Sequence, residues 1–327
     1  MKEFNPSYLK LHLSGELFHR AIEAQTMLAK CTLCGWECGV DRIKGETGQC
    51  FSGHLARVSS FFPHHGEEKP ISGMRGSGTI FFSRCNLHCV FCQNYDISQM
   101  NSGKEVSSKE LADMMLILQE QGCHNINLVS PTHVVPHILS ALLIAVDKGF
   151  HLPLVYNTGG YDSLKTLKLL DGIVDIYMPD MKYADEANAQ QYSKIPHYPK
   201  TNQAAVKEMH HQVGDLVQDE HGIALHGLLV RHLVLPSGIA GSEQIIKFLA
   251  EEISTHAYLN LMDQYRPEYH AYDYPQINRP ITQDEYQQAL RYAVENGLTR
   301  LDARIGSGNS HKDSMGGTTS PYKSRFT

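Results

Sequence analysis

Residues 79–94 read Thr-Ile-Phe-Phe-Ser-Arg-Cys-Asn-Leu-His-Cys-Val-Phe-Cys-Gln-Asn, and this stretch decides the fold class that the sequence predicts. Its first four residues form a short apolar run, which is typical of a strand buried on both faces. Three cysteines, Cys85, Cys89 and Cys92, follow directly at the spacing C-x3-C-x2-C. The stretch therefore predicts a buried strand that leads into a loop able to wrap around a metal centre.

The number of cysteines in this loop restricts the kind of metal centre. A closed structural zinc site has four protein ligands, and a simple ferredoxin cluster is also bound by four thiolates. Three thiolates leave one iron of such a cluster open to a ligand from outside the protein. His88 is a candidate fourth ligand for zinc, although its place between two cysteines makes the reach awkward.

Short apolar runs and helical patterns alternate along the rest of the chain. The predicted strands cover residues 79–83, 125–130, 152–157, 174–178, 228–235 and 258–262. In this part of the chain, the first predicted helix starts at the capping box of residues 107–110 and ends near Gly122. Further helices are predicted at about 134–148, 162–170, 202–214, 243–254 and 283–296. Repeated βα units predict a parallel sheet, as an open doubly wound sheet or a partial barrel. In both, functional residues lie at the carboxyl ends of the strands.

The three-cysteine spacing, with Phe91 directly before the last cysteine, resembles the signature of radical S-adenosylmethionine (SAM) enzymes. The resemblance implies an α/β fold, namely a partial (β/α)6 TIM-like barrel of the radical SAM type. It implies that Cys85, Cys89 and Cys92 hold a [4Fe–4S] cluster, whose open iron is chelated by SAM. Reductive cleavage of SAM would then give a 5′-deoxyadenosyl radical that takes a hydrogen atom from the substrate. The protein supplies ligation, orientation and exclusion of water.

Residues at predicted strand ends are the expected contacts for SAM, and no catalytic side chain beyond the cluster ligands is predicted. The expected contacts are Phe91, Ser130, Thr132, Asn157, Asp180, Lys182 and His232. Ser130 and Thr132 stand where the family usually has a Gly-Gly-Glu-like turn. Asp180-x-Lys182 is similar to a SAM-contacting motif of pyruvate formate-lyase activating enzymes, although an ion pair at the surface is the simpler alternative. Arg231 precedes His232 and points to the opposite face of the strand, so at most one of the two faces the barrel interior.

A second group of cysteines lies near the N-terminus, after a predicted helix at residues 7–29. Cys31, Cys34, Cys38 and Cys50 follow the spacing C-x2-C-x3-C-x11-C in a glycine-rich segment. Four thiolates fit one zinc ion, which would fold a segment that has little core of its own. They fit an auxiliary [4Fe–4S] cluster equally well, and the spacing does not separate these two metal centres.

The chain is expected to have three regions. Residues 1–72 comprise the N-terminal helix and the four-cysteine segment, and residues 73–300 comprise the radical SAM core. Residues 301–327 form a tail with almost no apolar residues from Gly306 onward, so we expect it to be disordered.

The composition argues against several classes of protein. The 327 residues include 29 Lys+Arg against 35 Asp+Glu, a net charge of −6 that offers no footprint for nucleic acid. No apolar run approaches the ~20 residues that span a bilayer, and the N-terminus has no signal-peptide pattern. We therefore expect a cytoplasmic protein with neither a membrane nor a nucleic-acid partner. In that reducing compartment, clustered cysteines indicate metal ligands or catalytic groups rather than disulfides.

Taken as a whole, residues 31–300 resemble an uncharacterised branch of radical SAM proteins that is similar to pyruvate formate-lyase activating enzymes. The segments 125–133, 174–183 and 264–267 carry this resemblance. It implies that the protein installs a glycyl radical in a partner enzyme and takes electrons from a donor such as flavodoxin or ferredoxin. Two alternatives stay open: a radical SAM enzyme acting on a small metabolite or peptide, and a non-catalytic zinc protein that serves as an interaction module.

Overall fold

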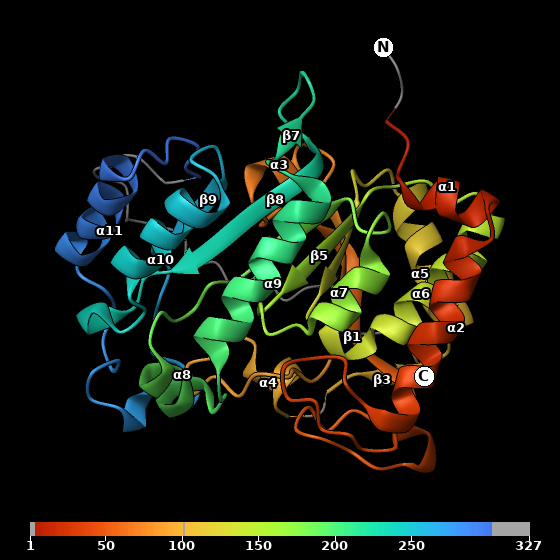
Figure 1. Cartoon of the computed structure of the whole chain (residues 1–327), viewed down its shortest axis with the longest axis horizontal. Helices are drawn as coiled ribbons and strands as arrows, with labels where there is room; N and C mark the ends of the chain where they lie inside the picture. The colour runs from red at the N-terminus through yellow and green to blue at the C-terminus, as the bar shows by residue number, and fades with distance from the viewer. Residues whose placement is uncertain (1–3, 101, 303–327) are drawn as a thin grey trace, which may run out of the picture.

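The computed structural model describes residues 4–100 and 102–302, and a mixed β-sheet forms its centre (Figure 1). Six strands of this sheet run parallel in the order β2-β4-β5-β6-β8-β9. Their bounds are β2 Ser77–Phe82, β4 Ile126–Val129, β5 Leu154–Thr158, β6 Ile176–Pro179, β8 Ala224–Leu233 and β9 Tyr258–Met262. Each overlaps a strand predicted from an apolar run, and β9 has the predicted bounds.

Helices connect the successive parallel strands, and α11 follows the last of them. Their bounds are α5 Ser108–Glu120, α6 Val135–Asp147, α7 Leu164–Leu170, α8 Glu186–Ser193, α9 Tyr198–Val213, α10 Ser242–Phe248 and α11 Gln283–Glu295. The sheet is open, because β2 and β9 do not pair with each other among the described strands. The prediction of an α/β fold with a partial (β/α)6 barrel is confirmed. The structure adds α8, for which no helix was predicted, and starts α9 at residue 198 rather than 202.

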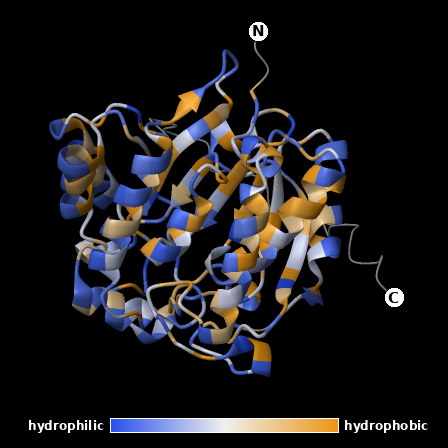
Figure 2. Cartoon of the chain, turned by 45° about the vertical axis from the view of Figure 1, so that its right-hand side comes forward, coloured by the Kyte–Doolittle hydropathy of each residue, from blue (hydrophilic) through white to orange (hydrophobic). Residues whose placement is uncertain are grey.

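The two faces of the sheet differ in chemistry. Ile80, Leu128 and Tyr156 belong to the main hydrophobic core, which the strands share with helices such as α5 and α6. Side chains alternate along a strand, so Asn127 and Asn157 lie on the opposite, inner face. Figure 2 shows hydrophobic residues along the central strands and hydrophilic residues on the outer surfaces of the helices. The inner face therefore combines burial with polar groups, as a binding site requires.

The N-terminal segment packs directly on the sheet's helices. The helix predicted at 7–29 is divided into α1 Tyr8–Leu13, α2 Glu16–Thr26 and the 3-10 turn η1 Met27–Lys30. Gly15 separates α1 from α2 with a φ of 79°, a left-handed conformation that glycine adopts without strain. Leu17 and Ala24 of α2 are buried in the main core, where α2 contacts α6.

Residues 51–75 contain a further strand of the same sheet, for which no strand was predicted. β1 Ala56–His64 pairs antiparallel with β2 and with β3 Lys104–Val106. The burial of β1 does not alternate, and its pairing with β2 is irregular between Val58 and Ser60, so no period of two marks it as a strand. The predicted boundary at residue 72 therefore falls within one continuous sheet.

Several short elements complete the described chain. They are η2 Arg42–Lys44, α3 Lys69–Ser72, α4 Tyr95–Ser98, η3 Thr132–Val134, β7 Val217–Gln218, η4 Pro236–Gly238, the π-helical turn η5 Leu249–Ile253 and η6 Ala271–Asp273. In residues 4–100 and 102–302, no helix has the length and apolar character to cross a membrane. The tail predicted to be disordered lies, from residue 303 on, outside the described residues.

Candidate functional site

The loop after β2 carries the three cysteines, and each sulfur has a polar group beside it. Cys85 Sγ accepts a hydrogen bond from the backbone N–H two residues later, at 3.4 Å. Ser193 Oγ donates to Cys89 Sγ at 2.9 Å, and Ser98 Oγ lies 3.2 Å from Cys92 Sγ. Hydrogen-bond donors of this kind stabilise thiolates bound to a metal and tune its potential.

Burial keeps two of these thiols protonated in the absence of a metal. It raises the pKa of Cys85 to about 12 and the pKa of Cys89 to about 11, against the opposing effect of the Lys182 charge. A bound metal replaces the thiol proton, since the thiolate is the ligand. The donor set therefore fits a metal centre, and Lys182 supplies positive charge beside it.

The C-terminal end of α8 fixes the conformation of the cysteine loop. The backbone N–H of His88 donates to the carbonyl of Ser193 at 3.1 Å, and that of Val90 donates to the carbonyl of Tyr192 at 2.8 Å. These carbonyls have no partner within a helix that ends there. The ring of His88, considered above as a fourth zinc ligand, bonds the side chain of Gln99 at 3.0 Å.

Phe91 packs beside the cysteine loop. Its side chain is buried, and its ring makes edge contacts with Tyr265 and Tyr183 at centroid distances of 5.7 and 6.5 Å. Aromatic pairs of this geometry add to the stability gained from burial. The structure therefore shows that Phe91 packs against neighbouring aromatic rings.

Asp180 at the end of β6 joins two partly buried cations. Lys182 Nζ donates to one carboxylate oxygen at 2.6 Å, and Arg231 Nε donates to the other at 2.8 Å. Arg231 also donates to Asn157 Oδ1 on β5 at 2.8 Å. Burial alone would raise the pKa of Asp180, but the charges of Arg231 and Lys182 outweigh it and hold that pKa below its usual value. Asp180 is only 8% exposed, so the pair is not the surface ion pair considered as an alternative.

We call Asn157, Asp180, Lys182, Arg231 and Glu68 the strand-end cluster. Sequence reasoning missed Glu68. Glu68 precedes α3 and places one carboxylate oxygen 3.9 Å from Arg231 Nη1 and 2.9 Å from the side-chain nitrogen of Asn260 on β9. Its other oxygen is buried and has no hydrogen-bond partner among the described residues. Both side-chain polar atoms of Asn127 on β4 are also buried and have no hydrogen-bond partner among the described residues. The alternation of polar and apolar residues at 125–128 was the available signal for Asn127.

The other expected SAM contacts lie apart from this cluster or have protein partners. Thr132 is buried and donates to Asp162 Oδ1 at 2.7 Å. His232 uses both ring nitrogens, one near the carbonyl of Met181 at 2.7 Å and the other near Ser242 Oγ at 2.8 Å. Arg231, rather than His232, therefore belongs to the strand-end cluster. Ser130 stays near it, with a positive φ of 58°, and its N–H donates to the carbonyl of Asn157 at 2.9 Å.

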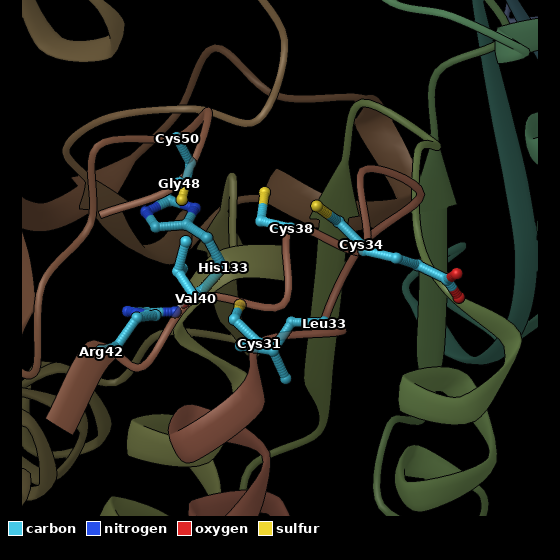
Figure 3. A pocket seen from close by; sticks show the side chains of 10 residues that line it. Cys31, Leu33, Cys34, Cys38, Val40, Arg42, Gly48, Cys50 and His133 are labelled. Carbon is cyan, nitrogen blue, oxygen red and sulfur yellow. Dashed lines mark hydrogen bonds between the residues drawn. The ribbon is translucent and has the colours of Figure 1, made fainter. Parts of the chain in front are cut away.

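The four N-terminal cysteines gather around one small cavity. The side chains of Cys31, Cys34, Cys38 and Cys50 line it (Figure 3), together with Arg42 and His133. Backbone hydrogen bonds fold the segment back on itself, from the N–H of Cys31 to the carbonyl of residue 40 and from the N–H of residue 39 to the carbonyl of Cys31. We call residues 31–50 the cysteine knuckle.

The knuckle is packed against the loop that carries the other three cysteines. Trp36 Nε1 donates to the carbonyl of Asn86, directly after Cys85, at 2.7 Å. The side chain of Asn86 in turn donates to the carbonyl of Tyr161 at 2.9 Å, the same carbonyl that accepts from the N–H of Gly35 at 3.2 Å. Two groups of cysteines that are separate in the sequence are therefore neighbours in the fold.

The comparisons with known proteins agree with this geometry. The family model of the radical SAM superfamily matches residues 79–219. A protein of Methanocaldococcus jannaschii named "Uncharacterized protein MJ0674" is 34% identical over 287 residues, which are 84% of this chain and 77% of that protein. The chain therefore belongs to the radical SAM superfamily. Membership implies SAM and a [4Fe–4S] cluster as cofactors.

Solved structures of related fold are more distant. A radical SAM methyltransferase from Sphaerobacter thermophilus shares 13% identity with a TM-score of 0.48 and covers 88% of this chain and 89% of its own. Methylornithine synthase shares 12% identity with a TM-score of 0.46, over 99% of this chain and 89% of its own. A domain of a pyruvate-formate lyase-activating enzyme from Bacteroides vulgatus shares 13% identity with a TM-score of 0.34, over 58% of this chain and 88% of its own.

Proposed function

We propose that this protein cleaves SAM reductively, with Cys85, Cys89 and Cys92 as the ligands of a [4Fe–4S] cluster. The observation that carries the proposal is a single loop with three thiols, each beside a polar hydrogen. The bound cluster and SAM together supply a 5′-deoxyadenosyl radical that removes a hydrogen atom from the substrate. The chain's own residues hold these groups in place and exclude water, since Leu87, Phe91 and Tyr183, which pack with the cysteines, are buried.

The strand-end cluster is the proposed binding site for the polar groups of SAM. Lys182 offers a positive charge close to Cys89, whose pKa it affects. Asn157 and Asp180 lie at the ends of adjacent parallel strands, which is where barrels of this class bind ligands. Arg231 holds both of these side chains in position, so we assign it a positioning role. Ser130 is the neighbouring candidate for a direct contact.

The proposed substrate is a glycine residue of a glycyl-radical enzyme. The support is the resemblance to pyruvate formate-lyase activating enzymes, in particular Asp180-x-Lys182 at a strand end. The reaction needs a one-electron donor, and flavodoxin or ferredoxin is the proposed partner. We assign the reaction to the cytoplasm, where a reducing environment keeps thiols free. None of the eight cysteines, all of which the structure describes, forms a disulfide.

A second metal centre is proposed at Cys31, Cys34, Cys38 and Cys50. The support is the cavity that their side chains share with Arg42. A thiolate centre would also explain why a segment of low apolar content has a defined fold.

Formation of 5′-deoxyadenosine tests the first proposal. After anaerobic reconstitution with iron and sulfide, the reduced protein should turn brown and convert SAM into 5′-deoxyadenosine and methionine, measured by chromatography. Cys89→Ala should abolish this product, because the loss of one ligand dismantles the cluster. Cys123→Ala is the matched control, since Cys123 is buried in the core and belongs to neither group of cysteines. A colourless protein that contains only zinc, or full turnover by Cys89→Ala, would contradict the proposal.

A glycyl radical tests the substrate. The active protein is incubated with glycyl-radical enzymes encoded in the same genome, and the electron paramagnetic resonance spectrum is recorded. The proposed activity predicts a doublet that depends on SAM. Formation of 5′-deoxyadenosine without a doublet from any of these enzymes would instead identify a small metabolite or a peptide as the substrate.

A further inference from the structure

We propose that the cysteine knuckle binds an iron–sulfur cluster rather than zinc, with Arg42 as the cation that balances its charge. The inference deepens the proposed second metal centre, and it does not depend on the turnover of SAM. Figure 3 shows the four sulfurs around a common space, with Arg42 and His133 on the same side of it. Four thiolates are the ligand set that a complete [4Fe–4S] cluster takes from a protein.

The size of the cavity distinguishes the two metal centres. A zinc ion bound by four thiolates lies about 2.3 Å from each sulfur, so the sulfurs crowd around the ion and leave no space for a water molecule. The cavity lined by the four cysteines measures about 10 Å³, close to the ~10–15 Å³ that one water molecule requires. The cavity is therefore wider than the space that four thiolates leave around one zinc ion.

The spacing of the side chains agrees with the size of the cavity. In residues 4–100 and 102–302, no three histidine, cysteine, aspartate or glutamate side chains are grouped closely enough to hold one metal ion. This applies to the knuckle cysteines, with or without His133. It applies equally to Cys85, Cys89 and Cys92, which stand in the cluster-binding loop of this superfamily. Both groups are therefore spaced more widely than the ligands of one metal ion.

Arg42 supplies the second, independent observation. Its side chain is only 1% exposed, and none of the described carboxylates forms an ion pair with it. Nε and Nη1 donate to the carbonyls of Gly53 and His133 at 2.9 and 2.8 Å, whereas Nη2 is buried without a partner among the described residues. A buried charge without a counterion is strongly unfavourable. Four thiolates around a cluster carry net negative charge, which provides the missing counterion.

The metal content of a variant without the other site tests the proposal. The full-length Cys85→Ala/Cys89→Ala/Cys92→Ala protein keeps the knuckle and loses the SAM cluster. It is reconstituted anaerobically with iron, sulfide and an equal concentration of zinc, and its metals and sulfide are then measured. We expect about four iron and four sulfide per chain, with the visible absorption of a cluster. About one zinc with no sulfide would overturn the proposal, and so would a folded protein that binds neither metal.

Additional variants assign the cluster to its ligands. Cys34→Ser in the triple variant should abolish the iron and the sulfide, whereas Cys123→Ser should leave both unchanged. Circular dichroism shows whether each protein is folded. We expect none of these proteins to cleave SAM. Their metal content therefore tests the knuckle independently of the radical chemistry proposed for the other loop.

Arg42 is tested through the reduction potential of the cluster. Removal of a positive charge disfavours an added electron, so Arg42→Gln should shift the potential to a more negative value in the triple variant. Arg42→Lys keeps the charge and should restore most of the potential. Equal potentials in all three proteins would overturn the role of Arg42. If Arg42→Gln loses the cluster, retention of the cluster by Arg42→Lys still supports the requirement for charge, and loss in both rejects it.

Discussion

Asp180 is the residue on which two partly buried cations depend. Arg231 and Lys182 each donate to one of its oxygens, and Glu68 reaches Arg231 only at 3.9 Å. Asp180→Asn keeps the shape of the side chain but removes the charge that both cations share. Loss of one partner of a buried ion pair costs about 3 kcal/mol. We therefore expect Asp180→Asn to lower the free energy of unfolding in urea by about that amount and to weaken SAM binding.

An exposed ion pair provides the control for Asp180. Asp113 pairs with Lys148 at 2.7 Å, and both side chains are more than 40% exposed. Exposed pairs contribute less than about 1 kcal/mol, so Asp113→Asn should change neither stability nor SAM binding by more than that. Equal effects of the two substitutions would mean that the strand-end cluster has no special energetic role.

Asp175 gives the stability of the protein a dependence on pH. It accepts hydrogen bonds from the backbone N–H of Leu154 at 2.9 Å and of Ser7 at 3.3 Å, but burial raises its pKa from 3.8 to about 7. A group whose pKa rises on folding stabilises the protein fully below its unfolded pKa, and this contribution is lost as the pH rises through the folded pKa. Between pH 4 and 7 this carboxyl should lower the free energy of unfolding by up to about 1.4 kcal/mol per pH unit.

Asp175→Asn separates this contribution from those of other titrating groups. The asparagine cannot ionise, so the difference in unfolding free energy between the two proteins should change steadily over this range of pH. A difference that stays constant from pH 4 to pH 7 would show that Asp175 titrates at its ordinary pKa.

At the level of elements, the sequence predicted what local patterns encode. Short apolar runs located all six parallel strands, and the capping boxes at Ser107 and Thr282 located the starts of α5 and α11. β1 was missed because its side chains lack a period of two. α8 was missed as well, since only residues 189, 192 and 193 of its eight are buried. Where tertiary contacts rather than periodicity stabilise an element, a single sequence gives little signal.

In the cysteine knuckle, Gly48 leaves room for the side chain of Cys38. A Cβ atom at Gly48 would lie 2.6 Å from Cys38 Sγ and 2.9 Å from Cys38 Cβ, so the whole Cys38 side chain would have to move. We expect Gly48→Ala to reduce the iron bound by the triple cysteine variant severalfold. Gly53→Ala is the matched control, because a Cβ atom there meets nothing within 4 Å. Equal iron in the two variants would show that Cys38 is not a required ligand.

At the scale of the whole molecule, the site is assembled from segments that no local pattern connects. Glu68 bonds Asn260 across 192 residues of sequence, and Arg42 reaches His133 across 91. The resemblance to radical SAM enzymes predicted a site at the cysteines and the strand ends, because those residues belong to sequence motifs. It could not identify Glu68, or choose Arg231 over His232, because both depend on the packing of several strands around one buried space.

The contact between the knuckle and the loop of Cys85, Cys89 and Cys92 should make the stability of the loop depend on the metal proposed for the knuckle. Trp36, the single tryptophan, donates to the carbonyl of Asn86 and is placed by the cysteines on either side of it. Loss of the knuckle metal in Cys31→Ser/Cys50→Ser should release this hydrogen bond, which contributes about 1 kcal/mol. Amide hydrogen exchange at His88 and Val90, whose N–H groups bond α8, should then become about fivefold faster.

Trp36→Phe keeps the four cysteines but lacks the donor, so it should reproduce the increase while the knuckle retains its metal. Exchange in α11, which lies on the opposite side of the molecule from residues 31–50 (Figure 1), should stay unchanged in both proteins. Faster exchange in α11 as well would indicate general destabilisation, and unchanged exchange in the loop would show that the two cysteine groups are independent.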